Sequence, residues 1–213
     1  MDRQVILNDL STYWDELRGH RVAPRRSDLN PNRFGAALEH MFILETSQDG
    51  PLRIRLAGTR LCDMMGMEPR GMPARAIFMP PDQRHADSLL NEVVRNPAVI
   101  DITINATSES GAVYEGGMML RPLCDDFGTV TRVLGCIVMD APQFEVNLDI
   151  GISSASVNTL GEPASSMEPA GFAEEQTPFE GPHIRSVPQT GTVTRPTRQP
   201  LSRDHLRIVS SRG

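Results

Sequence analysis

Few residues of this 213-residue chain have types and spacing suited to chemistry, and none of them forms a catalytic motif. Asp125 and Asp126 are adjacent carboxylates, and enzymes use pairs of carboxylates for acid–base chemistry. They precede Phe127 and Gly128, a sequence typical of a hairpin turn whose side chains face solvent. The glycines within residues 58–71 are spaced as turn residues and not as a phosphate-binding loop. We therefore expect that the protein is not an enzyme.

Cysteine and histidine are the remaining candidates for reactive or metal-binding groups. The three cysteines, Cys62, Cys124 and Cys136, form no CxxC pair and are odd in number, which argues against a disulfide framework or a zinc site. We interpret them as buried structural thiols. His85 lies near the start of a predicted helix, where a surface or capping role is the simplest interpretation. No metal site is expected.

Charge and hydropathy exclude several kinds of partner. All 21 basic residues are arginine, and the formal net charge is -6, which argues against nucleic acid as a partner. No apolar run approaches the roughly 18 residues needed to cross a membrane. The first residues lack the apolar core of a signal peptide. We therefore expect a cytoplasmic protein that binds neither nucleic acid nor a membrane.

The elements that position these side chains are indicated by hydrophobic periodicity. Leu10, Trp14 and Leu17 form a stripe that predicts a helix over 8–18. Trp14 either anchors this helix on the domain or forms an exposed dimer contact. A second short helix is predicted over 31–38, and residues 41–46 read as a strand that a turn joins to the next strand.

The block that follows has the clearest alternation in the first third of the chain. Leu52, Ile54 and Leu56 alternate with arginines, which predicts a half-buried strand with all three on the core face. A charge placed at Leu56 is then expected to unfold the domain. Gly58 and Thr59 end the strand and begin a helix over 60–65.

The remaining periodic segments are helical and then extended. Helical turns are predicted over 74–78, and an apolar stripe predicts a helix from Pro81 to just before Pro97. Three antiparallel strands are predicted over 100–107, 113–123 and 130–139.

The composition changes after Asp140. Residues 141–213 are rich in Ser, Thr, Pro, Gly, Gln and Glu and lack sustained periodicity, which predicts a disordered tail. The tail is acidic over 141–180 and basic over 181–213. We therefore divide the chain into an N-terminal helical flank (1–38), a central domain (39–140) and this tail.

This order of elements resembles the PAS fold, an α+β architecture with a five-stranded antiparallel sheet and flanking helices. The block from Arg53 to Cys62 resembles the opening of a divergent PAS family typical of alphaproteobacteria, often found as stand-alone proteins. The other matching stretches are 14–19, 24–31, Arg121-Pro122-Leu123 and the terminal His205-Leu206-Arg207.

The resemblance implies a single-domain sensory or adaptor protein of bacterial signalling that acts by protein–protein contact. Its partners would include a histidine kinase or regulators of motility and the cell cycle, and it would form a homodimer. No cofactor is expected, and the identity of any small ligand stays open. The alternative is a redox or gas sensor that binds heme or another small ligand. In heme-binding PAS proteins the corresponding helix carries the axial histidine, which would be His85. Flavin-reactive PAS domains need Asn-Cys-Arg-Phe, whereas Cys62 follows Leu61 and precedes Asp63.

A cavity under the sheet is the expected ligand site. It is either a filled core or a pocket for a small apolar ligand. The residues expected to line it are Leu56, Met64, Ile77, Leu89, Val93, Ile104, Met119 and Cys136.

Overall fold

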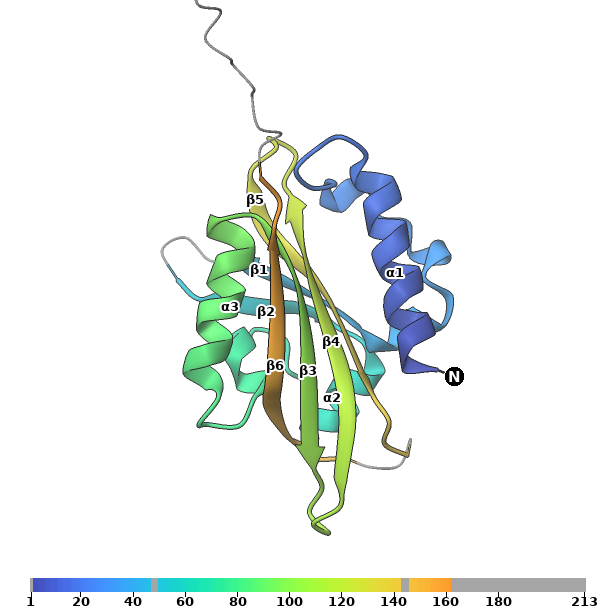
Figure 1. The fold of residues 1–213 in the computed structure, drawn as a ribbon, viewed down its shortest axis with the longest axis vertical. Coiled ribbons are helices and arrows are strands. Elements are labelled where there is room, and N and C mark those ends of the chain that lie inside the picture. The colour runs from blue at the N-terminus through green and yellow to red at the C-terminus, as the bar shows by residue number, and fades with distance from the viewer. Residues whose placement is uncertain (1, 47–49, 143–145, 162–213) are drawn as a thin grey trace, which may run out of the picture. The chain divides into compact units, whose positions relative to one another are not determined.

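The computed structural model describes residues 2–46, 50–142 and 146–161. Its centre is one antiparallel sheet of six strands in the order β2-β1-β5-β4-β3-β6 (Figure 1). The strands are β1 (Met41–Thr46), β2 (Leu52–Ala57), β3 (Ala98–Thr107), β4 (Val113–Cys124), β5 (Val130–Met139) and β6 (Asp149–Thr159). The helices are α1 (Arg3–Arg18), α2 (Thr59–Met65) and α3 (Gln83–Arg95), with short 3-10 helices η1 (Arg26–Asp28), η2 (Pro31–Arg33), η3 (Gly35–His40) and η4 (Ala74–Ile77).

Helices cover both faces of the sheet. One hydrophobic core lies between the sheet and α2, η4 and α3, and it includes Leu61, Val93 and Ile104. A second core lies on the opposite face, under α1 and the segment from η1 to η3, and it includes Trp14 and Phe34. Figure 1 shows α1 and α3 on opposite sides of the strands. The predicted N-terminal flank therefore packs on the central sheet.

Most predicted elements are confirmed within a few residues. The helix around Trp14 begins earlier than expected because Asp2 caps it, its side chain accepting from the amide of Gln4 at 2.9 Å. The short helix after β2 ends where expected, at Gly66 with a φ of 65°. The segment predicted as one helix over 31–38 forms two short 3-10 helices instead.

The predicted number of strands is wrong, because a sixth strand lies in the segment assigned to the tail. Strand β6 pairs antiparallel with β3 along its whole length, from Asp149 opposite Thr107 to Thr159 opposite Ala98. Only its first residues, such as Ile150, are buried, and the serines that follow are exposed. Because the strand buries so little, its sequence lacks the alternation that identifies a half-buried strand. The rest of the predicted tail, 162–213, lies outside the described residues, as does His205-Leu206-Arg207.

None of the helices in the described part of the chain is long and apolar enough to cross a membrane.

Candidate functional site

The eight residues expected to line one cavity lie in three different places. Five of them, namely Met64, Ile77, Leu89, Val93 and Ile104, belong to the core beneath α2, η4 and α3. Met119 and Cys136 belong to the core on the opposite face. Leu56 belongs to neither core and is 45% exposed. The expectation that all eight share one face of the sheet is therefore corrected.

Strand β4 explains why Met119 and Cys136 were assigned to the wrong face. Both faces of this strand are covered, so Met118 and Met119 are equally buried and hydrophobicity cannot distinguish them. The register of β3 with β4 decides which face each methionine lies on. Ile102 pairs with Met118, and both belong to the core beneath α2, η4 and α3. Met119 pairs with Cys136 in β5, and this pair faces α1.

Leu56 is exposed because the β1–β2 ladder contains a β-bulge. Ile43 pairs with Leu56 and Leu44 pairs with Ile54, so Arg55 is the extra residue. One extra residue reverses the side of the sheet on which the following side chain lies. Leu56 therefore shares the face of Ile43, away from the core that holds Ile54.

This reversal makes Leu56 part of an apolar groove on the outer face of the sheet, which is the face that α1 and the segment from η1 to η3 cover. The groove has a volume of about 640 Å³ and lies between the segment from η1 to η3 and strands β1 and β2. Its large apolar lining residues are Leu29, Phe34, Leu38, Met41, Phe42, Ile43 and Leu56. Leu38 is 52% exposed, so the side chains of both Leu38 and Leu56 are exposed at the surface of the groove. Glu39 also lines it.

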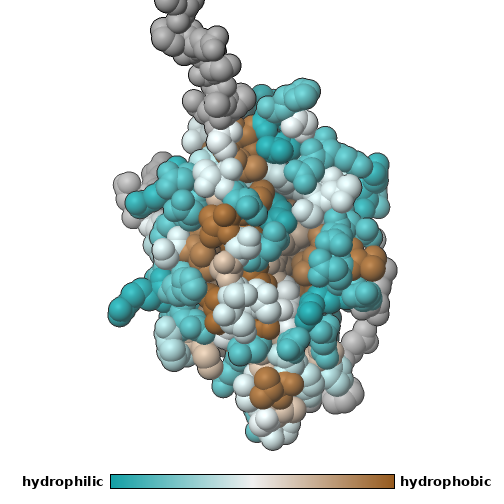
Figure 2. Space-filling view, viewed as in Figure 1, coloured by the Kyte–Doolittle hydropathy of each residue, from teal (hydrophilic) through white to brown (hydrophobic). Residues whose placement is uncertain are grey.

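Large exposed apolar residues are otherwise scattered over the described surface. On the face that Figure 2 views, apolar patches are separated by hydrophilic residues. Phe127 and Val113 are the most exposed large apolar residues, and neither lines the groove. We therefore treat the apolar groove as the candidate site, since isolated exposed apolar residues are ordinary.

Gly58 holds the wall of the groove in place. Its amide donates to the carbonyl of Met41 at 2.8 Å. A Cβ atom at this position would lie 2.3 Å from the carbonyl oxygen of Glu39 and 2.8 Å from that of Leu38. Glycine is therefore required for η3 to approach this closely, and the Gly58-Thr59 motif has a structural role at the groove.

An arginine pocket adjoins the apolar groove and shares Arg26, Ile43 and Leu56 with it. Its volume is about 570 Å³. Its charged lining residues are Arg26, Arg55, Arg70, Arg132, Glu45 and Asp126. Glu45 accepts two bonds from Arg132, at 2.7 and 3.0 Å, and lies 3.6 Å from Arg55.

The other candidate residues are not near this site or lack a chemical partner. His85 lies on the exposed side of α3, whereas Ala86 and Leu89 face the core. An axial heme ligand must face an interior cavity, so His85 does not fit that role. The described residues contain no group of three or more metal-ligating side chains.

The cysteines are free thiols with weak acidity. Burial raises the pKa of Cys136 to about 12, and burial likewise raises the pKa values of Cys124 and Cys62. A raised pKa keeps each thiol protonated, which makes it a poor nucleophile. Cys136 and Cys124 are buried and Cys62 is half-buried, so burial is confirmed for two of the three.

Asp125 lies in a hairpin turn, as expected. Its Oδ1 accepts from the amides of Phe127 at 2.9 Å and Thr129 at 3.0 Å. This side chain therefore stabilises the turn. Asp126 is exposed.

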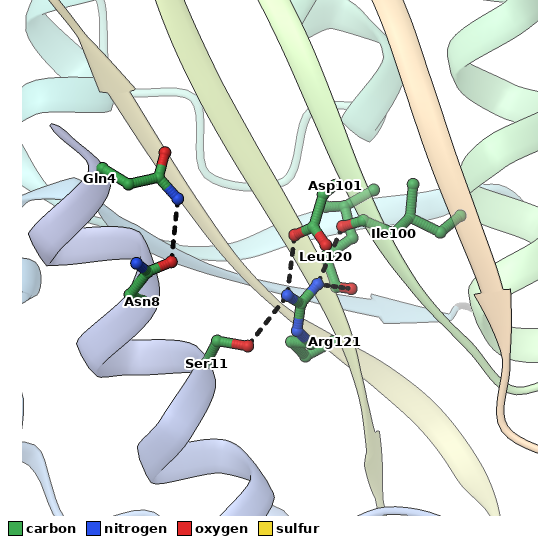
Figure 3. A network of polar contacts seen from close by, with 7 residues as sticks. All are labelled: Gln4, Asn8, Ser11, Ile100, Asp101, Leu120 and Arg121. Carbon is green, nitrogen blue, oxygen red and sulfur yellow. Dashed lines mark hydrogen bonds and ion pairs between the residues drawn. The ribbon is translucent and has the colours of Figure 1, made fainter.

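Arg121 and His40 are buried polar residues whose contacts the sequence analysis does not predict. Arg121 donates to the carbonyls of Ile100 and Leu120 at 3.0 and 3.1 Å, to Ser11 at 3.1 Å and to Asp101 at 2.8 Å (Figure 3). It therefore joins α1 to β3 and β4. An isolated arginine in an apolar strand is the only signal that the sequence carries for this network.

His40 is the second. It is 8% exposed at the end of η3, and its Nδ1 lies 3.1 Å from the carbonyl oxygen of Ile137. Burial lowers the pKa of His40, and the hydrogen bond to Ile137 and the charge of Glu39 oppose this shift only in part.

The fold defines an α+β module whose antiparallel sheet carries α2, η4 and α3 on one face, and α1 with the segment from η1 to η3 on the other. A family model described as a PAS domain matches residues 3–138. The chain belongs to the PAS domain family. No curated protein matches its sequence.

Solved structures with a similar chain path include three LOV proteins. The dark structure of the blue-light photoreceptor Aureochrome1 LOV is 16% identical, with a TM-score of 0.40 over 52% of this chain and 81% of that one. A LOV protein of Rhodobacter sphaeroides is 11% identical, with a TM-score of 0.39 over 53% and 69%. An RNA-binding Light-Oxygen-Voltage receptor is 18% identical, with a TM-score of 0.40 over 51% and 32%.

Proposed function

We propose that this PAS domain is a cytoplasmic sensory or adaptor module that acts by protein–protein contact and has no enzymatic activity. Its partner would be a signalling protein such as a histidine kinase, in the manner of the alphaproteobacterial branch that its sequence resembles. The observation that carries the proposal is the apolar groove. It exposes Leu38 and Leu56, which belong to neither hydrophobic core, on the outer face of the sheet.

The composition of the groove supports a protein partner. Protein interfaces have an apolar centre and a polar rim. Leu38 and Leu56 supply apolar surface, and the arginine pocket next to them supplies the charged rim. Seven of the eight side chains expected to line an interior ligand site belong to the two cores instead, with Val93 and Ile104 fully buried.

Capture with groove variants tests this proposal. The full chain is used as bait in a lysate of the native cell, as wild type, as Leu56→Asp and as Val113→Asp. Val113 is a matched control because it is 67% exposed and lies outside the groove. We expect a signalling protein to bind wild type and the Val113 variant and to be lost with Leu56→Asp. Equal capture by all three baits would contradict docking in the groove.

Homodimerisation is a separate proposal. Trp14 does not mediate it, because its side chain is fully buried and its indole donates to Pro122. Sedimentation equilibrium of the full chain tests it, and a monomer at micromolar concentration would count against it. A visible absorption spectrum of the purified protein tests the alternative of a heme or flavin sensor, which predicts a Soret or flavin band.

A further inference from the structure

We propose that the apolar groove and the arginine pocket together bind an amphipathic helix of a partner protein, with an apolar stripe flanked by acidic residues. The inference rests on the proposed function, because it specifies the partner of the same groove. It concerns the chemistry of that partner and not its identity.

The groove itself fits the apolar stripe of a helix. Helices that bind in grooves insert side chains spaced at i, i+4 and i+7 between apolar residues of the partner. Here Leu38 of η3 and Leu56 of β2 are both exposed, while Leu29 and Phe34 line the groove and are buried. The volume of about 640 Å³ is large enough for several such side chains.

A strand is a less suitable occupant, because the outer edge of β2 is already occupied at Ile54. The amide of Ile54 donates to the carbonyl of Met72 at 2.9 Å. The amide of Gly71 donates to the carbonyl of Ile54 at 2.7 Å. A peptide that adds a strand needs these backbone groups free. An occupant of this surface must therefore bind through side chains, as a helix does.

The charges beside the groove favour an acidic partner. In the described part of the chain, the lining residues of the arginine pocket that form no ion pair are Arg26, Arg70 and Asp126, two positive charges against one negative charge. Glu45 is engaged by Arg132 and Arg55. The two cavities are lined by four arginines and by Glu39, Glu45 and Asp126, in a chain whose net charge is -6.

The β-bulge places the apolar and the basic side chains next to each other. Arg55 is the extra residue of the bulge, and its side chain is 71% exposed. Leu56 follows it and is exposed as well. Rim charges of this kind accelerate association with an oppositely charged partner and lose their effect at high ionic strength.

A display selection tests the proposed chemistry without a known partner. The probe is a library of random peptides of about 16 residues, long enough for a helix of about four turns. Peptides are selected on the full-length wild-type protein and counter-selected on Leu56→Asp. We expect the enriched peptides to be net acidic, with large apolar residues at helical spacing. Enriched peptides that are neutral or basic, or no enrichment that depends on Leu56, would overturn the inference.

Charge variants provide the second measurement. Arg26→Gln with Arg70→Gln should weaken binding of a selected peptide about tenfold, and high ionic strength should weaken binding to wild type similarly. Arg84→Gln with Arg95→Gln is the matched control, because both residues are exposed on α3, on the opposite face. Equal weakening by both pairs would contradict a local charge effect.

The outcomes separate the inference from the proposed function. If a native partner is lost with Leu56→Asp while the selected peptides are not acidic, the groove docks a protein and the acidic helix is wrong. If neither capture nor selection depends on Leu56, the proposed function fails as well. A second copy of the chain as occupant is revealed by a dimer that Leu56→Asp dissociates, and this result also overturns the acidic helix.

Discussion

The indole Nε1 of Trp14 donates a 3.0 Å hydrogen bond to the carbonyl oxygen of Pro122, which joins α1 to β4 across 108 positions of sequence. Pro122 lacks an amide hydrogen, and the β3–β4 ladder ends before it, at the pair of Ile100 with Leu120. Two of the stretches in which the sequence resembles the family, around Trp14 and around Arg121, therefore meet in the structure. Their contact fixes the N-terminal helix on the outer face of the sheet.

Removing the indole nitrogen should loosen this attachment. Trp14→Phe leaves the buried carbonyl of Pro122 without its donor and creates a small cavity, so we expect a loss of about 2 to 4 kcal/mol in the free energy of unfolding. Urea denaturation measures it. Tyr13→Phe is a matched control, since its hydroxyl accepts from the exposed amide of Asn30. Equal losses in the free energy of unfolding for both variants would show that the buried hydrogen bond contributes no more to stability than the exposed one.

Arg121 and Asp101 should contribute unequally to the free energy of unfolding. Arg121→Met removes the donor to four acceptors in a buried position, and we expect it to cost about 2 to 4 kcal/mol. Asp101→Asn should cost less than about 1 kcal/mol, because the Asp101 side chain is 54% exposed and its ion pair is screened by water. Comparison of the two unfolding free energies checks this. A larger loss for Asp101→Asn would mean that the ion pair dominates.

The β-bulge predicts that the same substitution has very different effects on stability at Ile54 and at Leu56. Ile54→Asp places a charge in the core, where Ile54 is 1% exposed, and should cost more than about 4 kcal/mol. Leu56→Asp should change the free energy of unfolding by no more than about 0.5 kcal/mol, because Leu56 is 45% exposed. Thermal melts of both variants test the register. Strong destabilisation by Leu56→Asp would place Leu56 back in the core.

Gly58→Ala should destabilise the protein although its φ of -74° is ordinary for alanine. The new methyl group would meet the backbone of Glu39 and Leu38, so η3 must move away, at a cost of about 1 to 3 kcal/mol. Gly161→Ala is the control, because nothing lies within 4 Å of its Cβ position. Unchanged stability of Gly58→Ala would show that η3 is free to shift.

Because His40 is buried, we expect the protein to lose stability in mild acid. Burial lowers its pKa in the folded state below the ordinary histidine value of 6.5. As pH falls below 6.5, the unfolded chain takes up the proton first, so the unfolded state is favoured. The stability is therefore full above this pH and declines until the folded-state pKa is passed. The unfolding free energy of wild type should fall more between pH 7.5 and 5 than that of His40→Gln. Parallel pH profiles would contradict this assignment.

The periodicity of the sequence located α3 and β3 well because each has one covered face, so apolar and polar residues alternate with the geometry of the element. It placed Met119 on the wrong face because β4 is covered on both sides. It missed β6 because an edge strand with one short buried end carries little hydrophobic signal. It identified Arg53–Cys62 as a family feature but assigned Leu56 to the core. The β-bulge instead places Leu56 on the other face of the sheet.

The sequence by itself determined the class of fold, the antiparallel pairing of its central strands and the absence of a recognisable catalytic motif, because these depend on local pattern and residue type. Only the tertiary structure decided where the candidate site lies. The groove arises from a single extra residue in the β1–β2 ladder and from the close approach of η3 to Gly58. Both are relationships between separate segments of the chain, which the pattern within either segment does not encode.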